Sequence, residues 1–281
     1  MEIDLNYHRL DIIVETSDSL PTHGGSMIRG AFGPALKRTV CVNPAFECKG
    51  CFESSECLFF DFYEKQNSYH SYRFDVDLSP NRFEFSLYIF NNSASKLPYI
   101  LAALEMMLTK IGLSAGRKRY DDFTIDCDGI RVYEKGRFYL DFIKLQKFSH
   151  TPLSDTFTLQ FLTPLRMKDR NEFLKSAPSL EQILHSIHLR YEALSGRGRS
   201  PLGYEPSYHQ TFARTRFLDL GRYSRRQETK LKIGGIVGEM GYSGVDERSC
   251  KLLRLGELIG VGKQTVFGMG KIALKESYES I

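Results

Sequence analysis

The sequence of 281 residues contains no tryptophan, and none of its apolar runs approaches the roughly 18 residues of a membrane-spanning helix. Its start mixes acidic, polar and apolar residues, and it lacks the basic-then-apolar order of a secretory signal. We therefore expect a cytoplasmic protein with no membrane partner. Hydrophobic residues make up 42% and charged residues 26%, which is typical of a globular protein and not of a disordered or fibrous one.

Cysteine is scarce except in one short segment. Four of the six cysteines lie within 17 residues, at Cys41, Cys48, Cys51 and Cys57. In a reducing compartment such a cluster favours a metal over disulfides. Only the central pair has zinc-knuckle spacing, but four thiolates can complete a closed tetrahedral zinc site. We predict a structural zinc and no catalytic metal; an iron–sulfur cluster or free core cysteines are the alternatives.

The first half of the chain predicts an alternation of strands and helices. Apolar residues recur at helical spacing over 27–38 and 97–111. Strand patterns cover 9–16, 71–78 and 82–90, and further strands pass through Val132 and Phe138. The order strand, helix, two strands, helix, strand is that of a ferredoxin-like domain.

The second half repeats this order without a residue-level repeat. Strands are predicted over 156–165, 211–218, 230–240 and 270–275, with helices over 180–194 and 247–259. We therefore predict an α+β protein of two tandem ferredoxin-like (RRM-like) domains, residues 1–148 and 149–281. The cysteine-rich insert 41–57 falls in the first domain, and a glycine-rich loop, 260–270, falls in the second.

Positive charge is concentrated in one segment. The whole chain has a formal net charge of +4, whereas residues 190–230 hold nine basic and four acidic residues, a net charge of +5. Eight of the nine are arginine, and tyrosines are interleaved among them. Arginine suits phosphate contacts and base stacking, so the pattern is typical of single-stranded RNA recognition. A solvated basic face is the alternative.

The glycine-rich loop does not match a nucleotide-binding motif. A P-loop needs glycine where Glu257 stands and Ser or Thr where Gln264 stands, and the dinucleotide fingerprint needs glycine at Thr265. Backbone amides beside Lys263 could still approach a phosphate closely. The alternative is a tight turn into the last strand.

Four segments together resemble a known family. They are residues 20–33, the Thr163–Arg166 segment, residues 222–227 followed by Gly234 and Gly235, and the glycine-rich loop before the final strand. In these the chain resembles the repeat-associated RAMP superfamily, and most of all the CRISPR-associated endoribonucleases that cut precursor crRNA within its repeats. The four-cysteine insert also fits this family.

The resemblance implies an RNA partner and a reaction. The expected reaction is metal-independent attack of a ribose 2′-OH on its own phosphate, which leaves a 2′,3′-cyclic phosphate and mature crRNA. The expected partners are CRISPR repeat RNA and other subunits of a CRISPR effector complex. Two alternatives are a crRNA-binding subunit that does not cleave and a zinc-stabilised RNA-binding protein of another process.

The resemblance also implies which residues form the site. A histidine near the first helix often serves as base in the family, and of seven histidines only His23 stands there, in the turn before a helix that itself holds none. We predict His23 as general base, with Tyr223 and Arg226 for the remaining proton transfer and charge stabilisation; Lys37 or Arg38 are alternatives for these roles. The predicted RNA-binding residues are Arg29, Lys37, Arg38, Arg117, Lys118, Arg119, Arg222, Arg225, Gly262, Lys263 and Gly268.

Overall fold

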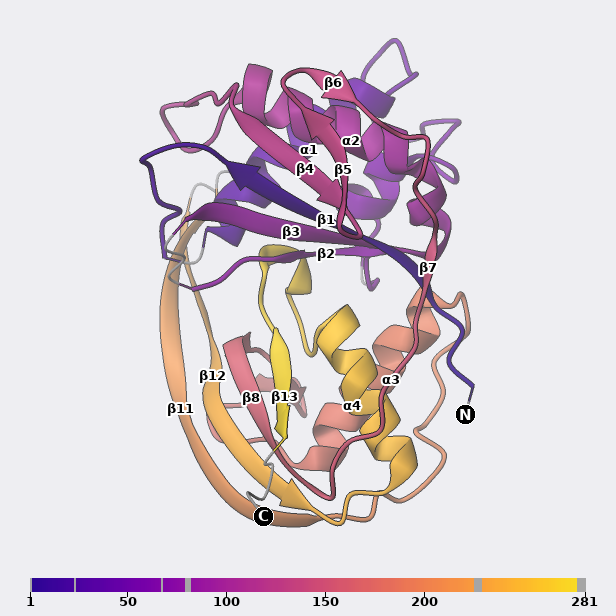
Figure 1. The fold of residues 1–281 in the computed structure, drawn as a ribbon, viewed down its shortest axis with the longest axis vertical. Helices are drawn as coiled ribbons and strands as arrows, with labels where there is room; N and C mark the ends of the chain where they lie inside the picture. The colour runs from indigo at the N-terminus through magenta and orange to yellow at the C-terminus, as the bar shows by residue number, and fades with distance from the viewer. Residues whose placement is uncertain (1, 23, 67, 79–81, 225–228, 277–281) are drawn as a thin grey trace. The chain divides into compact units, whose positions relative to one another are not determined.

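The computed structural model of this chain describes residues 2–22, 24–66, 68–78, 82–224 and 229–276, with backbone only over 221–224 and 229–233. It divides into two compact units (Figure 1). The N-terminal unit comprises Asp4–Lys147, and the C-terminal unit comprises Phe148–Ile281 together with Met1–Ile3.

The N-terminal unit is built on an antiparallel sheet with the strand order β2-β3-β1-β4, continued by β5 and β6. The elements of its ferredoxin-like plan are β1 (Asn6–Val14), α1 (Gly25–Val40), β2 (Tyr72–Asp75), β3 (Phe83–Phe90), α2 (Leu97–Met106) and β4 (Phe123–Cys127). The additions are β5 (Ile130–Glu134), β6 (Arg137–Phe138), β7 (Gln146–Lys147), and the short helices η1 (Phe60–Glu64), η2 (Asn91–Lys96) and η3 (Met107–Ile111).

The core of this unit lies between the sheet and its two long helices, which cover the same face of the sheet (Figure 1). Alternate residues of β1 are buried because successive side chains of a strand point to opposite faces. On α1, Ile28, Phe32 and Leu36 are buried at helical spacing. The Phe32 ring packs edge-on against Phe74 of β2, with ring centroids 5.7 Å apart, so helix and sheet interdigitate.

The C-terminal unit repeats the plan with the strand order β11-β12-β8-β13. Its main elements are β8 (Thr156–Leu165), α3 (Leu180–Leu194), β11 (His209–Ser224), β12 (Thr229–Ser243), α4 (Glu247–Ile259) and β13 (Ile272–Glu276). A small hairpin of β9 (Lys168–Asp169) and β10 (Glu172–Phe173) follows β8, and the turn η4 (Thr265–Phe267) precedes β13. The tandem ferredoxin-like fold predicted from the sequence is confirmed.

Local signals explain where the C-terminal helices begin. Ser179 caps α3 in a reciprocal capping box with Gln182. Asp246 caps α4 by accepting a hydrogen bond from the backbone N–H of Ser249. Gly260 follows α4 at a φ of +78°, a conformation that glycine adopts without strain. Within the described ranges, no helix is both long and apolar enough to cross a membrane.

The structure corrects two element boundaries. The predicted strands 211–218 and 230–240 extend into a much longer hairpin, in which β11 and β12 pair from His209 and Ser243 to Ser224 and Thr229. The predicted helix 97–111 divides into α2 and the π-helical turn η3.

Candidate nucleic-acid interface

The end of β8 lies directly beside the glycine-rich loop. The carbonyl of Pro164 accepts a hydrogen bond from the amide of Gly270 (3.1 Å), and the carbonyl of Arg166 accepts one from the amide of Lys263 (2.8 Å). Two of the segments on which the family resemblance rests are therefore packed against each other, although about 100 residues separate them in the sequence.

A third segment of the resemblance joins them. The guanidinium of Arg166 donates a hydrogen bond from Nη1 to the carbonyl of Gly234 (2.8 Å) and stacks over the ring of Phe173 at 3.6 Å. An added Cβ at Gly235 would lie 2.7 Å from the carbonyl oxygen of Leu165, so only glycine permits this approach. The residues 163–166, 234–235 and the glycine-rich loop thus form one cluster.

Sequence reasoning missed the organising role of Arg166. In the sequence Arg166 is only the last residue of the Thr163–Arg166 motif, and nothing local indicates that its guanidinium reaches β12 and β10. Burial lowers the pKa of Arg166 from its ordinary value, yet arginine remains a cation at neutral pH. Arg166 therefore places a fixed positive charge within the cluster.

The glycine-rich loop does not present the bare amides that we predicted. The amide of Gly262 donates to Ser186 Oγ (3.0 Å), that of Lys263 to the carbonyl of Arg166, and that of Gly268 to the carbonyl of Thr265 (3.0 Å). These three predicted phosphate contacts are engaged inside the protein. The alternative, a tight turn into the last strand, describes the loop better. The side chain of Lys263 is nevertheless exposed.

The predicted arginine-rich residues of the C-terminal unit belong to the β11–β12 hairpin. In the backbone register Arg222 lies opposite Leu231 and Tyr223 lies opposite Lys230. The predictions at Arg225 and Arg226 fall between these strands, outside the described residues.

Arg29 of the N-terminal unit has a packing role. Its Nε donates to the hydroxyl of Tyr72 (3.0 Å), and its guanidinium lies 4.4 Å from the centroid of the Tyr63 ring. The Tyr63 hydroxyl in turn donates to the Arg29 carbonyl (2.8 Å). These contacts join α1 to η1 and β2, so the Arg29 guanidinium that we predicted to bind RNA is engaged inside the N-terminal unit.

The basic turn between η3 and β4 is tied to the loop that precedes α1. Its residues Arg117, Lys118 and Arg119 are exposed. The ammonium of Lys118 lies 2.6 Å from a carboxylate oxygen of Asp18, and the hydroxyl of Tyr120 donates to the same oxygen (2.8 Å). The structure therefore anchors this turn to the connection between β1 and α1.

These contacts shift the pKa of both acidic groups, Asp18 and Tyr120. Hydrogen bonds from Lys118 and Tyr120 lower the pKa of Asp18, while burial, with a further contribution from Asp18, raises the pKa of Tyr120 to about 12. Tyr120 is consequently neutral near pH 7. His23, the predicted base, belongs to the same connection but lies outside the described residues.

Two predicted RNA-binding residues at the end of α1, Lys37 and Arg38, have different surroundings. Arg38 is exposed in the last turn. The ammonium of Lys37 instead lies over the rings of Phe46 (4.7 Å) and Phe59 (5.2 Å). The Lys37 side chain is therefore packed against the cysteine loop and does not belong to an open basic surface.

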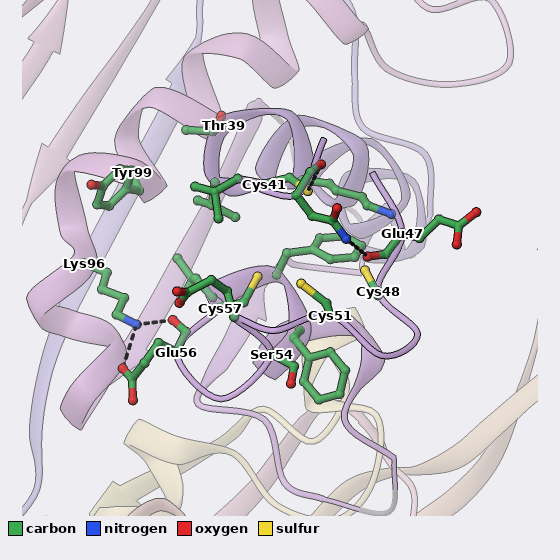
Figure 2. Close-up of a pocket in the computed structure, with 18 residues that line it drawn as sticks. Thr39, Cys41, Glu47, Cys48, Cys51, Ser54, Glu56, Cys57, Lys96 and Tyr99 are labelled. Carbon is green, nitrogen blue, oxygen red and sulfur yellow. Dashed lines mark hydrogen bonds and ion pairs between the residues drawn. The ribbon is translucent and has the colours of Figure 1, made fainter. Parts of the chain in front are cut away.

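The cysteine-rich segment surrounds a cavity of about 310 Å³ that all four thiols line. Figure 2 shows Cys41, Cys48, Cys51 and Cys57 around this cavity. All four are half-buried and unpaired by disulfides. Burial raises the pKa of Cys48, and the nearby Lys37 ammonium opposes that shift. Among the described residues, however, no three of these sulfurs come within 4.8 Å of one another.

Two different family models match the two halves of the chain. Residues 159–272 match the family model of the CRISPR-associated endoribonuclease Cas6, and residues 4–140 match a model described as an N-terminal domain. An uncharacterized protein of Archaeoglobus fulgidus is 28% identical over 277 residues, which cover 89% of this chain and 91% of that protein.

Solved Cas6 structures share the fold over nearly the whole chain. Two structures of a Thermus thermophilus Cas6, the first a product complex, have TM-scores of 0.57 and 0.54 at 16% and 15% identity, and cover 97% and 98% of this chain and 100% and 99% of theirs. A Cas6 substrate-mimic complex has a TM-score of 0.52 at 17% identity, with 98% and 100% covered. The match of residues 159–272 to the Cas6 family model confirms, over that region, the resemblance predicted from the sequence.

Proposed function

From the match of residues 159–272 to the Cas6 endoribonuclease family model, we propose that this protein binds precursor crRNA and cleaves it within the repeats. The observation that carries the proposal is that the matched region contains the packed cluster of residues 163–166, 234–235 and the glycine-rich loop. The similar solved proteins include a substrate-mimic complex and product complexes, which supports an RNA substrate.

The proposed reaction transfers the phosphoryl group from the 5′-oxygen to the ribose 2′-oxygen. The ribose 2′-oxygen attacks the adjacent phosphorus and loses its proton to a base, and the bond from phosphorus to the 5′-oxygen breaks. The departing 5′-oxygen takes a proton from an acid, which leaves a 5′-hydroxyl on one product and a 2′,3′-cyclic phosphate on the other. The added negative charge on the phosphorane requires nearby cations.

We assign the base role to His23, because imidazole exchanges protons near neutral pH and its segment is held beside the basic turn through Asp18. Tyr223, or Arg226 three residues later in the sequence, supplies the acid and the stabilising charge. We propose phosphate contacts for the side chains of Arg38, Arg117, Lys118, Arg119, Arg222, Arg225 and Lys263.

A repeat RNA incubated in excess EDTA tests the reaction. We expect cleavage to persist in EDTA and to stop when the nucleotide at the cut carries a 2′-deoxyribose. Tight binding of the intact repeat without product would instead favour a crRNA-binding subunit of an effector complex. Equal affinity for repeat and unrelated RNA would favour an RNA-binding protein of another process.

The base is tested by His23→Ala, with His185→Ala as a matched control because His185 is an exposed histidine on α3. We expect His23→Ala to lower the cleavage rate at least about 100-fold, the contribution of a general base, while the affinity for the repeat stays unchanged. An unaltered rate would move the base to another residue.

We also propose that Cys41, Cys48, Cys51 and Cys57 hold a structural zinc. The support is a set of four soft thiol donors around one cavity, with the Lys37 ammonium beside them to offset thiolate charge. Zinc there would fold the loop after α1. Zinc content measured on the purified protein should fall by about one equivalent in Cys48→Ser with Cys51→Ser; bound iron and sulfide would identify an iron–sulfur cluster instead.

A further inference from the structure

Three side chains of different chemistry converge in the N-terminal unit, away from the cysteine loop. His8 Nδ1 lies 2.6 Å from Asp128 Oδ2, and Cys127 Sγ lies 3.4 Å from the same oxygen and 3.6 Å from the same nitrogen. In the part of the chain that the structure describes, they alone form a group of three metal-type ligands with all donor atoms within 4.8 Å.

The sheet builds this cluster from residues about 120 positions apart. The antiparallel register places Cys127 of β4 opposite Leu10 of β1, so His8 lies two residues further along the same face of β1. His8 is 5% exposed and Cys127 1% exposed, and the Asp128 side chain is 8% exposed. The cluster is therefore buried at the point where β1 meets the turn after β4.

The backbone orients the carboxylate. Asp128 Oδ1 accepts a hydrogen bond from the amide of Arg9 (2.9 Å), and the Asp128 amide donates to the Arg9 carbonyl (2.8 Å). The other oxygen, Oδ2, is thereby directed at His8 and Cys127. Such outer contacts are what fix a metal-binding carboxylate in place.

The separations suit tetrahedral zinc. With zinc bonds of about 2.0 Å to nitrogen and oxygen and about 2.3 Å to sulfur, the ligand atoms stand roughly 3.3–3.5 Å apart. The two sulfur separations already have that size. The short separation of Nδ1 and Oδ2 is that of a hydrogen bond, and it would open by less than about 1 Å when a metal replaces the proton.

The charges also balance. A thiolate and a carboxylate together neutralise a divalent cation, and the imidazole binds metal in its neutral form. A net-neutral complex suits a site so poorly exposed, because burying an uncompensated charge is costly.

We propose that His8, Cys127 and Asp128 bind a divalent transition metal, with Zn²⁺ the best match to these ligands. Three protein ligands leave the fourth tetrahedral position to water. The metal would join β1 to the turn between β4 and β5 and so stabilise the N-terminal unit. This site is separate from the four-cysteine loop, and it does not depend on the proposed RNA cleavage.

Metal analysis and Co²⁺ binding by the full chain test the proposal. We expect about two zinc equivalents in the unaltered protein, of which Asp128→Asn loses one, because asparagine keeps the shape of the side chain and removes its charge. In the background Cys48→Ser with Cys51→Ser, which removes the loop site, Co²⁺ should still give a thiolate-to-metal absorption band. Cys127→Ala should abolish that band, and Cys250→Ala, a half-buried cysteine of the C-terminal unit, should not.

Folding is monitored by thermal unfolding of each variant. If Cys127→Ala fails to fold, Asp128→Asn decides the question. A correctly folded background protein that binds no Co²⁺, or an Asp128→Asn protein that binds at least as tightly as its parent, would overturn the proposal and leave a buried hydrogen-bonded cluster only. A tenfold or greater loss of Co²⁺ affinity in Asp128→Asn supports it, whether or not the protein cleaves RNA.

Discussion

Replacing Gly270 by alanine tests whether the glycine-rich loop is needed for folding. Gly270 has a φ of +71°, and an added Cβ would lie 1.9 Å from the carbonyl oxygen of Val261. The Val261 amide donates to the Gly270 carbonyl (2.9 Å), and the Gly270 amide donates to Pro164. Because the clash lies between these bonded groups, relieving it must lengthen or break both hydrogen bonds.

The magnitude follows from these contacts. The left-handed conformation costs an alanine about 1 kcal/mol, and each lost hydrogen bond costs about 1 kcal/mol. The lower entropy of the unfolded alanine chain returns about 0.5 kcal/mol. We therefore expect Gly270→Ala to lower the free energy of unfolding by about 2–3 kcal/mol.

Two other glycines of the same unit separate the causes. Gly196 also has a positive φ (+69°), but an added Cβ would meet nothing within 4 Å, so Gly196→Ala should cost about 1 kcal/mol or less. Gly198 has neither constraint, and its replacement should be neutral or slightly stabilising. Denaturant unfolding gives all three values. If Gly270→Ala is as stable as Gly198→Ala, the loop is not packed closely around Gly270, and the reasoning is refuted.

Three further changes test other parts of the molecule. Lys263→Ala should change the unfolding free energy by less than about 0.5 kcal/mol but weaken repeat binding and reduce its salt slope by about 1, and an unchanged slope would remove Lys263 from the interface. Ser179→Ala should cost about 1 kcal/mol in denaturant unfolding through the lost capping box, whereas the exposed Ser176→Ala should cost little. Since the pKa of Asp18 is lowered in the folded state, its stabilisation is present above the unfolded pKa near 4 and is lost as pH falls, so Asp18→Asn should flatten the acid side of a stability profile.

The elements of the fold were predictable because their signals are local. The helix predicted over 247–259 and the strand predicted over 156–165 coincide with α4 and β8, since each has a clear apolar period and a clear boundary residue. The length of the β11–β12 hairpin was not predictable in this way. Its outer part carries charged and glycine residues and has no apolar pattern. The two strands continue there because they pair with each other.

The contacts of the candidate sites depend on tertiary structure. His8 had no special setting in the sequence, because its two neighbours in the buried cluster arrive from residues 127 and 128 through the register of β1 and β4. The hydrogen bonds of the glycine-rich loop could not be predicted for the same reason. The acceptors that engage its amides come from β8 and α3 as well as from the loop itself.

Charge counted along a sequence is not charge on a surface, and the segment 190–230 shows the difference. Arg190 is 2% exposed within α3, and Arg197 lies 3.6 Å from the carboxylate of the buried Glu192. These two arginines support α3 and the chain that follows it.

Three tyrosines of that segment, Tyr191, Tyr204 and Tyr208, are likewise used for packing. Tyr191 is fully buried, the Tyr204 hydroxyl bonds Ser249 Oγ at 3.0 Å, and Tyr208 packs edge-on against the buried ring of Tyr242. They do not offer the open stacking platform that their spacing suggested. On the described part of β11, Arg214 and Arg216 carry exposed side chains that can meet a phosphate backbone. Arg214 and Arg216 are therefore the exposed basic side chains in the described part of β11.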